Sequence, residues 1–329
     1  MRPFLQMKET PILSKILSQR IVVVALVLGT ALLSCVPVDS PPRLGNRGSS
    51  QPGSFGSAVL APSSSGVAPT VAPAQELPTG LAPANAVPAI SAKAAIVIDG
   101  TTGRVLAAKN PDERRAVAST QKILTALLTL ESGPLSDPVT VIDADTRVEP
   151  SKIYIRDGET YTRGALVKAL MVKSGNDVAK ALARDIAGSE SAFVSRMNSR
   201  ARALGMTQSN FRNPHGLTEE GQYSTARDIA ILARAAYQLP VFRSFVKTKS
   251  YTFTRPSGQT KTLTNTNQLL GRVPYCTGVK TGTTRASGRC LVSAGELNGR
   301  FTVVVVLGAD NQTKLYDDSE ALLRWSLER

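Results

Sequence analysis

A run of 55 residues that cannot build a hydrophobic core limits how much of this chain can fold. Residues 36–90 contain 10 Pro, 6 Gly, 8 Ser and 9 Ala, and only four of them are charged. Such a segment buries too little apolar surface to offset the conformational entropy that ordering would cost. We therefore expect residues 36–90 to form a disordered tether and residues 91–329 to fold as a single domain.

The first 35 residues have the pattern of a secretion signal. Four basic residues and one acidic residue precede an uncharged apolar run from Ile21 to Leu33, which is followed closely by Cys35. The 13 residues of this run are too few to span a bilayer as a helix, which takes about 20. The ending "LLSC" resembles the bacterial lipobox, in which cleavage leaves the cysteine as a lipidated N-terminus. A plain signal peptide, or an uncleaved anchor with an incidental cysteine, is the alternative.

The charge of the remaining chain narrows the class of partner. Residues 91–329 hold 33 Lys and Arg against 22 Asp and Glu, a net charge of +11, which favours anionic partners. Nucleic acid is not expected, because the sequence has no run of basic residues interleaved with aromatic ones and a secreted chain rarely meets DNA. An anionic cell wall or an acidic peptide fits the expected location in the bacterial cell envelope, in the periplasm or on the outer surface.

Cysteine and histidine are scarce in residues 91–329. Cys276 and Cys290 could form a disulfide in an oxidising compartment, or each could be a small buried apolar side chain. The single histidine, His215, lies in the turn-rich stretch "NPHGL", and we expect it to have a structural role. With one histidine and no cysteine pair at ligand spacing, neither a metal site nor a cofactor is expected.

The periodicity of the sequence indicates strands at both ends of the domain and helices between them. The runs at 94–99 and 103–109 predict a β-hairpin, and later runs predict strands at 249–255, 276–284, 288–297 and 300–309. Helical spacing occurs at 162–172, 177–188, 190–205, 225–239 and 317–327. This order predicts an α/β sandwich, in which an antiparallel sheet of about five strands is flanked by helices, with an all-helical lobe beside it.

A serine and a lysine three positions apart stand at the start of a further predicted helix. Lys122 begins the apolar repeat "KILTALLTL", and Ser119 stands three residues before it. The serine therefore lies near a helix N-terminus, where unpaired N–H groups favour negative charge. A lysine one turn away, if it is buried beside other cations, loses its proton and can activate the hydroxyl. The pair could equally be a helix cap and a solvated charge, because S-x-x-K is common and occurs again at Ser244 and Lys247.

Two further motifs favour the catalytic interpretation. The triplet "SGN" at 174–176 falls between two predicted helices, and the rarer "KTG" at 280–282 lies in a predicted strand. The set S-x-x-K, S-x-N and K-T-G, with its order and flanking sequence, resembles the serine penicillin-recognising enzymes, and within them the low-molecular-mass D-alanyl-D-alanine carboxypeptidases. The resemblance covers nearly all of residues 94–327 and implies a β-lactamase/transpeptidase-like fold.

The resemblance implies a serine DD-peptidase that cleaves the D-alanyl-D-alanine bond of peptidoglycan stem peptides through an acyl-serine, and that β-lactams acylate. It implies that Ser119 is the nucleophile, Lys122 its proton acceptor and Ser174 the relay to the leaving amine. It also implies an oxyanion hole made of the backbone N–H groups of Ser119 and Thr283. We expect any side chain in place of Gly282 to obstruct the substrate. The residues implied to bind substrate are Asn176, Lys280, Thr281, Gly282 and Thr283.

Three alternatives remain beside the carboxypeptidase. A DD-endopeptidase that cuts D-alanyl cross-links has the same motifs, and the arginine that family members often place before the closing helix is absent here, with Lys314 nearby. A β-lactamase of the common class needs a glutamate after S-x-N, and none occurs between Ser191 and Thr218. A wall-binding module without catalysis would be expected to have lost a motif residue, and all of them are intact.

Replacing Cys35 by alanine tests the predicted lipid anchor. Without the thiol no lipid can be attached, so the Cys35→Ala protein should move from the membrane fraction to the soluble fraction after cell disruption. Cys35→Ala and wild-type protein that fractionate alike would contradict the anchor.

Overall fold

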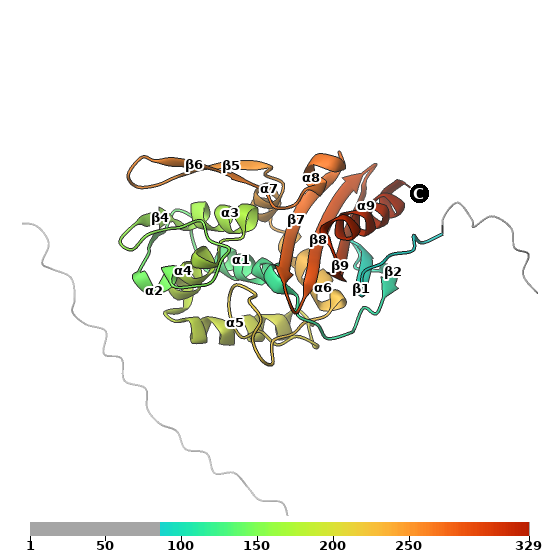
Figure 1. Ribbon diagram of the computed structural model, residues 1–329, viewed down its shortest axis with the longest axis horizontal. Helices are drawn as coiled ribbons and strands as arrows, with labels where there is room; N and C mark the ends of the chain where they lie inside the picture. Colours follow the sequence, from blue (N-terminus) through green and yellow to red (C-terminus); the bar gives the residue numbers. More distant parts are fainter. Residues whose placement is uncertain (1–85, 329) are drawn as a thin grey trace, which may run out of the picture. The chain divides into compact units, whose positions relative to one another are not determined.

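The structure is a computed structural model that describes residues 86–328. Its centre is a five-stranded antiparallel sheet in the order β2-β1-β9-β8-β7, in which the first two strands lie beside the last three (Figure 1). This confirms the predicted sheet assembled from both ends of the domain. The strands are β1 (Ala94–Asp99), β2 (Val105–Lys109), β7 (Cys276–Thr284), β8 (Gly288–Leu297) and β9 (Arg300–Ala309).

The apolar pattern of these strands follows from coverage on both faces of the sheet. In β1, Ile96 and Ile98 belong to one buried cluster, and Ala95 and Val97 belong to another, because side chains alternate between the two faces of a strand. The strand β9 has an almost unbroken apolar sequence, and its residues 302–309 are all buried. Continuous apolar strands of this kind are typical of a sheet that is covered on both sides.

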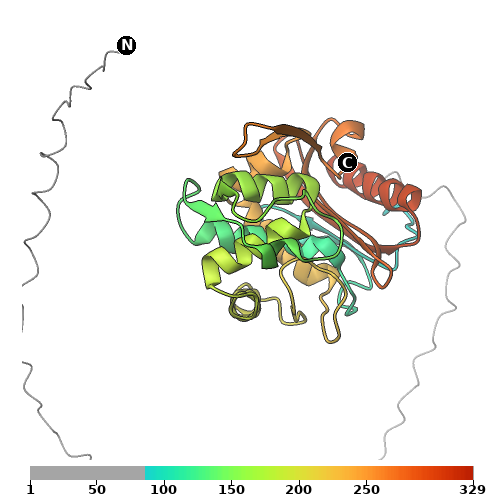
Figure 2. The ribbon, with the colours of Figure 1, turned by 60° about the vertical axis from the view of Figure 1, so that its left-hand side comes forward.

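Helices cover the two faces unequally (Figures 1 and 2). On one face, α9 (Gln312–Glu328) and the short α8 (Leu269–Arg272) enclose the smaller apolar cluster. On the other face, the helical part of the domain encloses the larger cluster. The carboxylate of Asp318 on α9 also holds the start of the domain, because it accepts hydrogen bonds from the backbone N–H groups of Ser91 (3.0 Å) and Ala92 (2.8 Å).

The middle of the chain forms the predicted helical lobe. The hydroxyls of Thr162, Ser189 and Thr225 cap three of its helices. Thr225 and Asp228 have the spacing of a capping box, in which the Asp228 side chain would accept from the backbone N–H of Thr225. The Asp228 carboxylate instead accepts from the Ser209 hydroxyl and from the Gln208 N–H. The helices are α1 (Lys122–Glu131), α2 (Asp143–Thr146), α3 (Arg163–Lys173), α4 (Asn176–Ala187), α5 (Glu190–Ala203), α6 (Ala226–Tyr237) and α7 (Pro240–Val246).

One predicted strand lies outside the main sheet. β5 (Ser250–Thr254) pairs with β6 (Thr260–Thr264) in a separate hairpin, and β3 (Pro138–Thr140) pairs with β4 (Thr160–Thr162) in another. Each strand of the β5–β6 hairpin buries a single residue. Such strands lack the continuous apolar side chains that a sheet covered on both faces requires, so the hairpin stays at the surface.

Cys276 and Cys290 are free, buried thiols, so the structure has the apolar alternative and not the disulfide. In the β7–β8 register Cys276 lies opposite Gly295, while Cys290 lies opposite Gly282. The two sites are therefore about 17 Å apart along the strands, whereas a disulfide needs Cα atoms within about 7 Å. The two thiols also belong to apolar clusters on opposite faces of the sheet.

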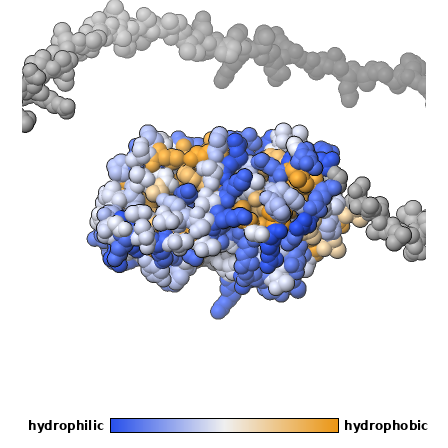
Figure 3. All heavy atoms as spheres, turned by 90° about the horizontal axis from the view of Figure 1, so that it is seen from above, coloured by the Kyte–Doolittle hydropathy of each residue, from blue (hydrophilic) through white to orange (hydrophobic). Residues whose placement is uncertain are grey.

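The surface seen from above is mostly hydrophilic, and hydrophobic residues appear there in separate patches (Figure 3). Large hydrophobic side chains are exposed in the described part of the chain at Val87, Val105, Ile142 and Tyr154. Within residues 86–328, no single helix has the length and apolar composition needed to cross a membrane. Only α6 and α7 taken together pass that test, with a bend of 112° between them.

Candidate active site

Ser119 and Lys122 meet where a 3-10 turn continues into a helix. The turn η1 (Ala118–Gln121) carries Ser119, and α1 begins at Lys122. Nζ of Lys122 lies 2.8 Å from Oγ of Ser119. Ser119 is half-buried, whereas Lys122 has no exposed surface. The serine is therefore the member of the pair that a substrate can reach.

The alternative of a helix cap and a solvated charge does not fit this pair. No side chain caps η1 or α1, and a fully buried lysine is not solvated. The second S-x-x-K pair has the ordinary arrangement instead. Ser244 and Lys247 are both exposed, and the Ser244 hydroxyl donates to the carbonyl of Val241 at 2.7 Å.

Oxygen atoms from two distant segments surround the Lys122 amine. Nζ donates to Oδ1 of Asn176 (2.6 Å), at the start of α4, and to the backbone carbonyl of His215. Nδ2 of Asn176 donates in turn to the carbonyl of Glu149 (3.0 Å). This second contact holds the amide with its oxygen toward Lys122.

Ser174 lies in the sharp turn between α3 and α4. It ends α3 in a left-handed conformation, with φ 68° and ψ 31°, and it is buried. Non-glycine residues rarely adopt this conformation, and they keep it where the surrounding structure holds it. Here the Ser174 N–H donates to Leu170 (3.0 Å) and the Asn176 N–H donates to Ser151 (2.7 Å). Among the described residues, the Ser174 hydroxyl itself has no hydrogen-bond partner.

Strand β7 adds Lys280 and Gly282 to the site. Lys280 is buried. A Cβ atom at Gly282 would lie 2.8 Å from the backbone nitrogen of Ser119 and 3.0 Å from that of Thr120. The structure thus gives a reason of its own for this glycine, because β7 packs directly against the backbone of η1. The expectation that a side chain here would obstruct the substrate stays a prediction.

Thr281 and Thr283 flank Gly282 on this strand. The hydroxyl of Thr281 donates to Oγ1 of Thr266 at 2.7 Å. Thr283 is exposed, and its hydroxyl donates to the carbonyl of Gly282 at 2.8 Å. Thr283 is thus the member of the motif region that is most open to a ligand.

Burial shifts the protonation of the basic groups in the site. Burial and then the charge of Lys280 lower the pKa of Lys122 well below its ordinary value, although Asp177 opposes the shift. Burial lowers the pKa of Lys280 to about 7. Burial, followed by the charges of Lys122 and Lys180, lowers the pKa of His215 to about 3. The imidazole is therefore neutral at pH 7, and a neutral form of the Lys122 amine is accessible.

His215 contributes to the site through its backbone, which the sequence did not reveal. Its carbonyl is the second acceptor for Lys122, and no side-chain pattern marks a backbone acceptor. The next residue, Gly216, has φ +89°, and a Cβ atom there would lie 2.2 Å from the carbonyl oxygen of Ala118. The loop can therefore approach η1 only with glycine at this position.

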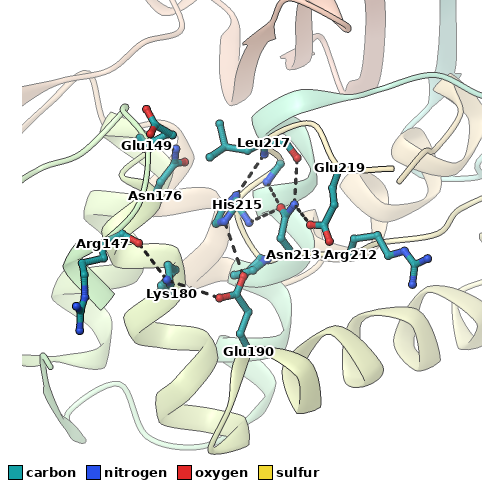
Figure 4. Close-up of polar contacts among 12 residues, drawn as sticks. Arg147, Glu149, Asn176, Lys180, Glu190, Arg212, Asn213, His215, Leu217 and Glu219 are labelled. Carbon is teal, nitrogen blue, oxygen red and sulfur yellow. Dashed lines mark hydrogen bonds and ion pairs between the residues drawn. The ribbon is translucent and has the colours of Figure 1, made fainter. Parts of the chain in front are cut away.

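A polar network holds the His215 loop in place (Figure 4). Oδ1 of the buried Asn213 accepts from the Gly216 N–H (2.8 Å), and its Nδ2 donates to Oε2 of Glu219 (3.0 Å). On the other side, Nε2 of His215 lies 3.8 Å from Glu190 of α5. The expected structural role of the imidazole therefore agrees with its contacts.

Replacing Lys280 by methionine tests the electrostatics of the site. The pKa of Lys280 is about 7 in the folded chain against an ordinary 10.5, so between these pH values the unfolded chain binds the additional proton. The free energy of unfolding of the wild type should therefore rise through this window, by about 1.4 kcal/mol per pH unit from this group. Lys280→Met should lose that slope in urea denaturation between pH 7 and pH 10, and the exposed Lys247→Met should retain it. Equal slopes for wild type and Lys280→Met would contradict the shift.

Comparison with known proteins places the chain in a family. The D-alanyl-D-alanine carboxypeptidase family, peptidase S11, matches residues 82–311. The D-alanyl-D-alanine carboxypeptidase DacF of Bacillus subtilis is 37% identical over 223 residues, which are 66% of this chain and 57% of DacF. The chain thus spans less than two thirds of the length of that relative. The D-alanyl-D-alanine endopeptidase of Escherichia coli is 32% identical over 260 residues, 77% of this chain and 83% of that protein.

Solved structures agree with this match. The crystal structure of a D-alanyl-D-alanine carboxypeptidase from Mycobacterium tuberculosis superposes with a TM-score of 0.70 and 32% identity, covering 76% of this chain and 94% of that one. This likeness confirms the predicted fold class. Since the family match extends over more than two thirds of the sequence, the chain belongs to the D-alanyl-D-alanine carboxypeptidase family, peptidase S11.

Proposed function

We propose that this protein is a serine D-alanyl-D-alanine carboxypeptidase, which removes the terminal D-alanine of peptidoglycan stem peptides through an acyl-serine. The observation that carries the proposal is the contact of 2.8 Å between the buried Nζ of Lys122 and Oγ of Ser119. Burial and the Lys280 charge lower the pKa of Lys122, so the reachable serine lies against an amine that can act as a base. Membership of the family supports this reaction.

The partners of Lys122 are those that a neutral amine needs. A neutral amine has two N–H donors and one lone pair, and Lys122 meets the two carbonyl oxygens of Asn176 and His215 and one hydroxyl. With both N–H groups donated to the carbonyls, the lone pair faces Ser119. It accepts the hydroxyl proton while Oγ attacks the peptide carbonyl. General-base catalysis of this kind contributes about 10² to 10⁴ in rate.

The attacked carbonyl becomes an oxyanion, and the contact between η1 and β7 offers donors for it. The backbone nitrogen of Ser119 faces Gly282, and Thr283 follows on the same strand. We assign the oxyanion hole to the N–H groups of Ser119 and Thr283, of which each donor is worth about 3 to 4 kcal/mol. Because β7 is an edge strand of the sheet, the substrate can bind to it as an added strand.

The remaining motif residues complete the reaction. The Ser174 hydroxyl, which has no partner among the described residues, relays the proton that Lys122 took from Ser119 to the leaving amine of D-alanine, which returns Lys122 to its neutral form. Lys280 keeps the electrostatic potential positive where negative charge develops, and Asn176 binds the peptide backbone. Water then attacks the acyl-serine with Lys122 again as the base, which regenerates the Ser119 hydroxyl.

A DD-endopeptidase is the second candidate. The overlap with the Escherichia coli endopeptidase, at 83% of that protein, is more complete than the overlap with DacF, at 57%. Both reactions attack a D-alanyl carbonyl and differ in the leaving group, which is D-alanine in one and a second stem peptide in the other. A β-lactamase is the weaker candidate, because no glutamate occurs between Ser191 and Thr218.

The proposal extends to the place where the enzyme acts. Cys35 and residues 36–85 of the predicted tether lie outside the described residues, and their sequence pattern supports a lipid anchor followed by a flexible spacer in the bacterial cell envelope. The net charge of +11 on residues 91–329 suits an anionic cell wall as the surface on which the enzyme works.

Labelling with a fluorescent penicillin tests the nucleophile and its base. Wild-type protein should be acylated, Ser119→Ala should not, and Lys122→Met should react about 10² to 10⁴ times more slowly. The second S-x-x-K pair supplies matched controls, and Ser244→Ala and Lys247→Met should label like the wild type. A wild type that is not acylated would contradict the enzyme, and rapid release of the label would favour a β-lactamase.

Digestion of purified muropeptides separates the two DD-peptidase functions. Incubated with pentapeptide monomers and with cross-linked dimers, the carboxypeptidase should release D-alanine from the monomers faster than it cuts the dimers. Chromatography and mass spectrometry of the products measure both rates. Faster cutting of the dimers would favour the endopeptidase and contradict the carboxypeptidase.

A further inference from the structure

Asp177 is a buried acid that the proposed mechanism does not use. It follows Asn176 in the first turn of α4, and its side chain has no exposed surface. Within residues 86–328 the carboxylate forms no ion pair and accepts hydrogen bonds only from four backbone N–H groups, one of them that of Val178 at 3.0 Å. A carboxylate removed from water in this way is unfavourable unless donors satisfy it. The role of the acid is therefore to be found in what its other donors belong to.

The other three donors are successive residues of one loop segment, residues 149–155, which we call the anchored segment. The carboxylate of Asp177 accepts from the N–H groups of Ile153 (3.2 Å), Tyr154 (2.7 Å) and Ile155 (3.3 Å). Tyr154 has a φ of 66°, a conformation that a non-glycine residue keeps only where the surrounding structure holds it. The carboxylate thus fixes a backbone that is strained at its centre.

The beginning of the anchored segment is bonded to Asn176. The carbonyl of Glu149, which lies beside Asn176 in Figure 4, accepts from its Nδ2 at 3.0 Å, and the carbonyl of Ser151 accepts from its backbone N–H at 2.7 Å. Oδ1 of Asn176 is thereby turned toward Nζ of Lys122, 2.6 Å away. One end of the segment is therefore held by Asp177, and the other end orients the amide that contacts the proposed base.

The glycine of the "SGN" motif provides a second sign of this arrangement. A Cβ atom at Gly175 would lie 2.7 Å from Oδ1 of Asp177 and 3.3 Å from Cγ2 of Ile153. The first of these distances is too short for a real contact, so a side chain at Gly175 would displace the carboxylate. The middle of the motif is open because Asp177 and the anchored segment pack against it.

We propose that Asp177 is a positioning residue of the active site, whose carboxylate anchors residues 149–155 and through them holds the Asn176 amide against Lys122. Asp177 touches neither the substrate nor the reacting atoms. The inference rests on the proposed function, in which Lys122 is the base. Without the anchor, the two carbonyls that orient Asn176 lose their fixed position. The amine then loses one of the acceptors that direct its lone pair toward Ser119.

The charge of Asp177 gives this role a signature that a loss of stability would not produce. Acylation needs the neutral amine of Lys122, so its rate falls as the pH falls through the pKa of that group. Burial and then the charge of Lys280 lower this pKa, and the charge of Asp177 opposes them. The remaining titratable group that interacts with Lys122 is His215, which is neutral at pH 7. Removing the Asp177 charge should therefore move the acidic limb of the pH profile to lower pH.

The pH dependence of penicillin acylation tests the proposal in the full-length enzyme. For Asp177→Asn we expect the maximal acylation rate to fall by about 10- to 100-fold and the midpoint of the acidic limb to move down by about one pH unit. Gly175→Ala keeps every charge and displaces the carboxylate, so it should also lower the rate.

Hydrogen exchange followed by mass spectrometry measures the anchor without relying on activity. The N–H groups of residues 153–155 should exchange faster in Asp177→Asn and in Gly175→Ala than in the wild type. Asp228→Asn is the matched control, because Asp228 is also a buried acid in the first turn of a helix, α6, and accepts from the backbone N–H of Gln208 at 2.8 Å. This variant should keep the acylation rate, the acidic limb and the slow exchange of the anchored segment.

The outcomes separate this proposal from the proposed function. A wild type that penicillin does not acylate would contradict the carboxypeptidase, while hydrogen exchange would still test the anchor. If the wild type is acylated, an unchanged rate, an unmoved acidic limb or unchanged exchange at residues 153–155 in Asp177→Asn each overturns the role of Asp177. Thermal unfolding shows whether the variants fold. If Asp177→Asn is unstable, the acylation rate and hydrogen exchange of Gly175→Ala decide.

Discussion

An amine removed from water is the constraint on which the rest of the structure depends. Lys122 is fully buried, and a buried ammonium without compensation is strongly unfavourable. The protein lowers the pKa of this amine and surrounds it with two carbonyl oxygens and one hydroxyl. Because those oxygens come from η1, α4 and the His215 loop, the same requirement that lets the amine be neutral, and so accept a proton, also holds these three segments together.

Close backbone contact makes that convergence possible. Gly282 of β7 and Gly216 of the His215 loop both pack on η1, and a Cβ atom at either position would collide with backbone atoms of Ala118 or Ser119. The short turn is thus held between the edge of the sheet and the loop. Ser119 acquires a fixed position from main-chain packing, in a segment where no side chain caps the helix.

The features that could be predicted from the sequence are those with a periodic apolar pattern or a recognisable set of side chains. The five-stranded sheet followed from apolar runs at both ends of the domain, and Ser119 and Lys122 could be paired by spacing. The carbonyl of His215 could not be found, because every residue has one. The predicted strand at 249–255 pairs with β6 outside the main sheet, and alternation alone does not tell which sheet a strand joins. The register that separates Cys276 from Cys290 is likewise set by strand pairing, which composition does not encode.

The carboxylate of Asp318 helps the start of the domain to resist a pulling force. It receives the N–H groups of Ser91 and Ala92, immediately before β1 enters the sheet between β2 and β9. Tension on the preceding chain would load these bonds to α9 before it shears a strand that is paired on both edges. Shearing requires many ladder hydrogen bonds to fail together, so a pull on the chain before Ser91 would leave the arrangement around Ser119 undisturbed until the sheet yields.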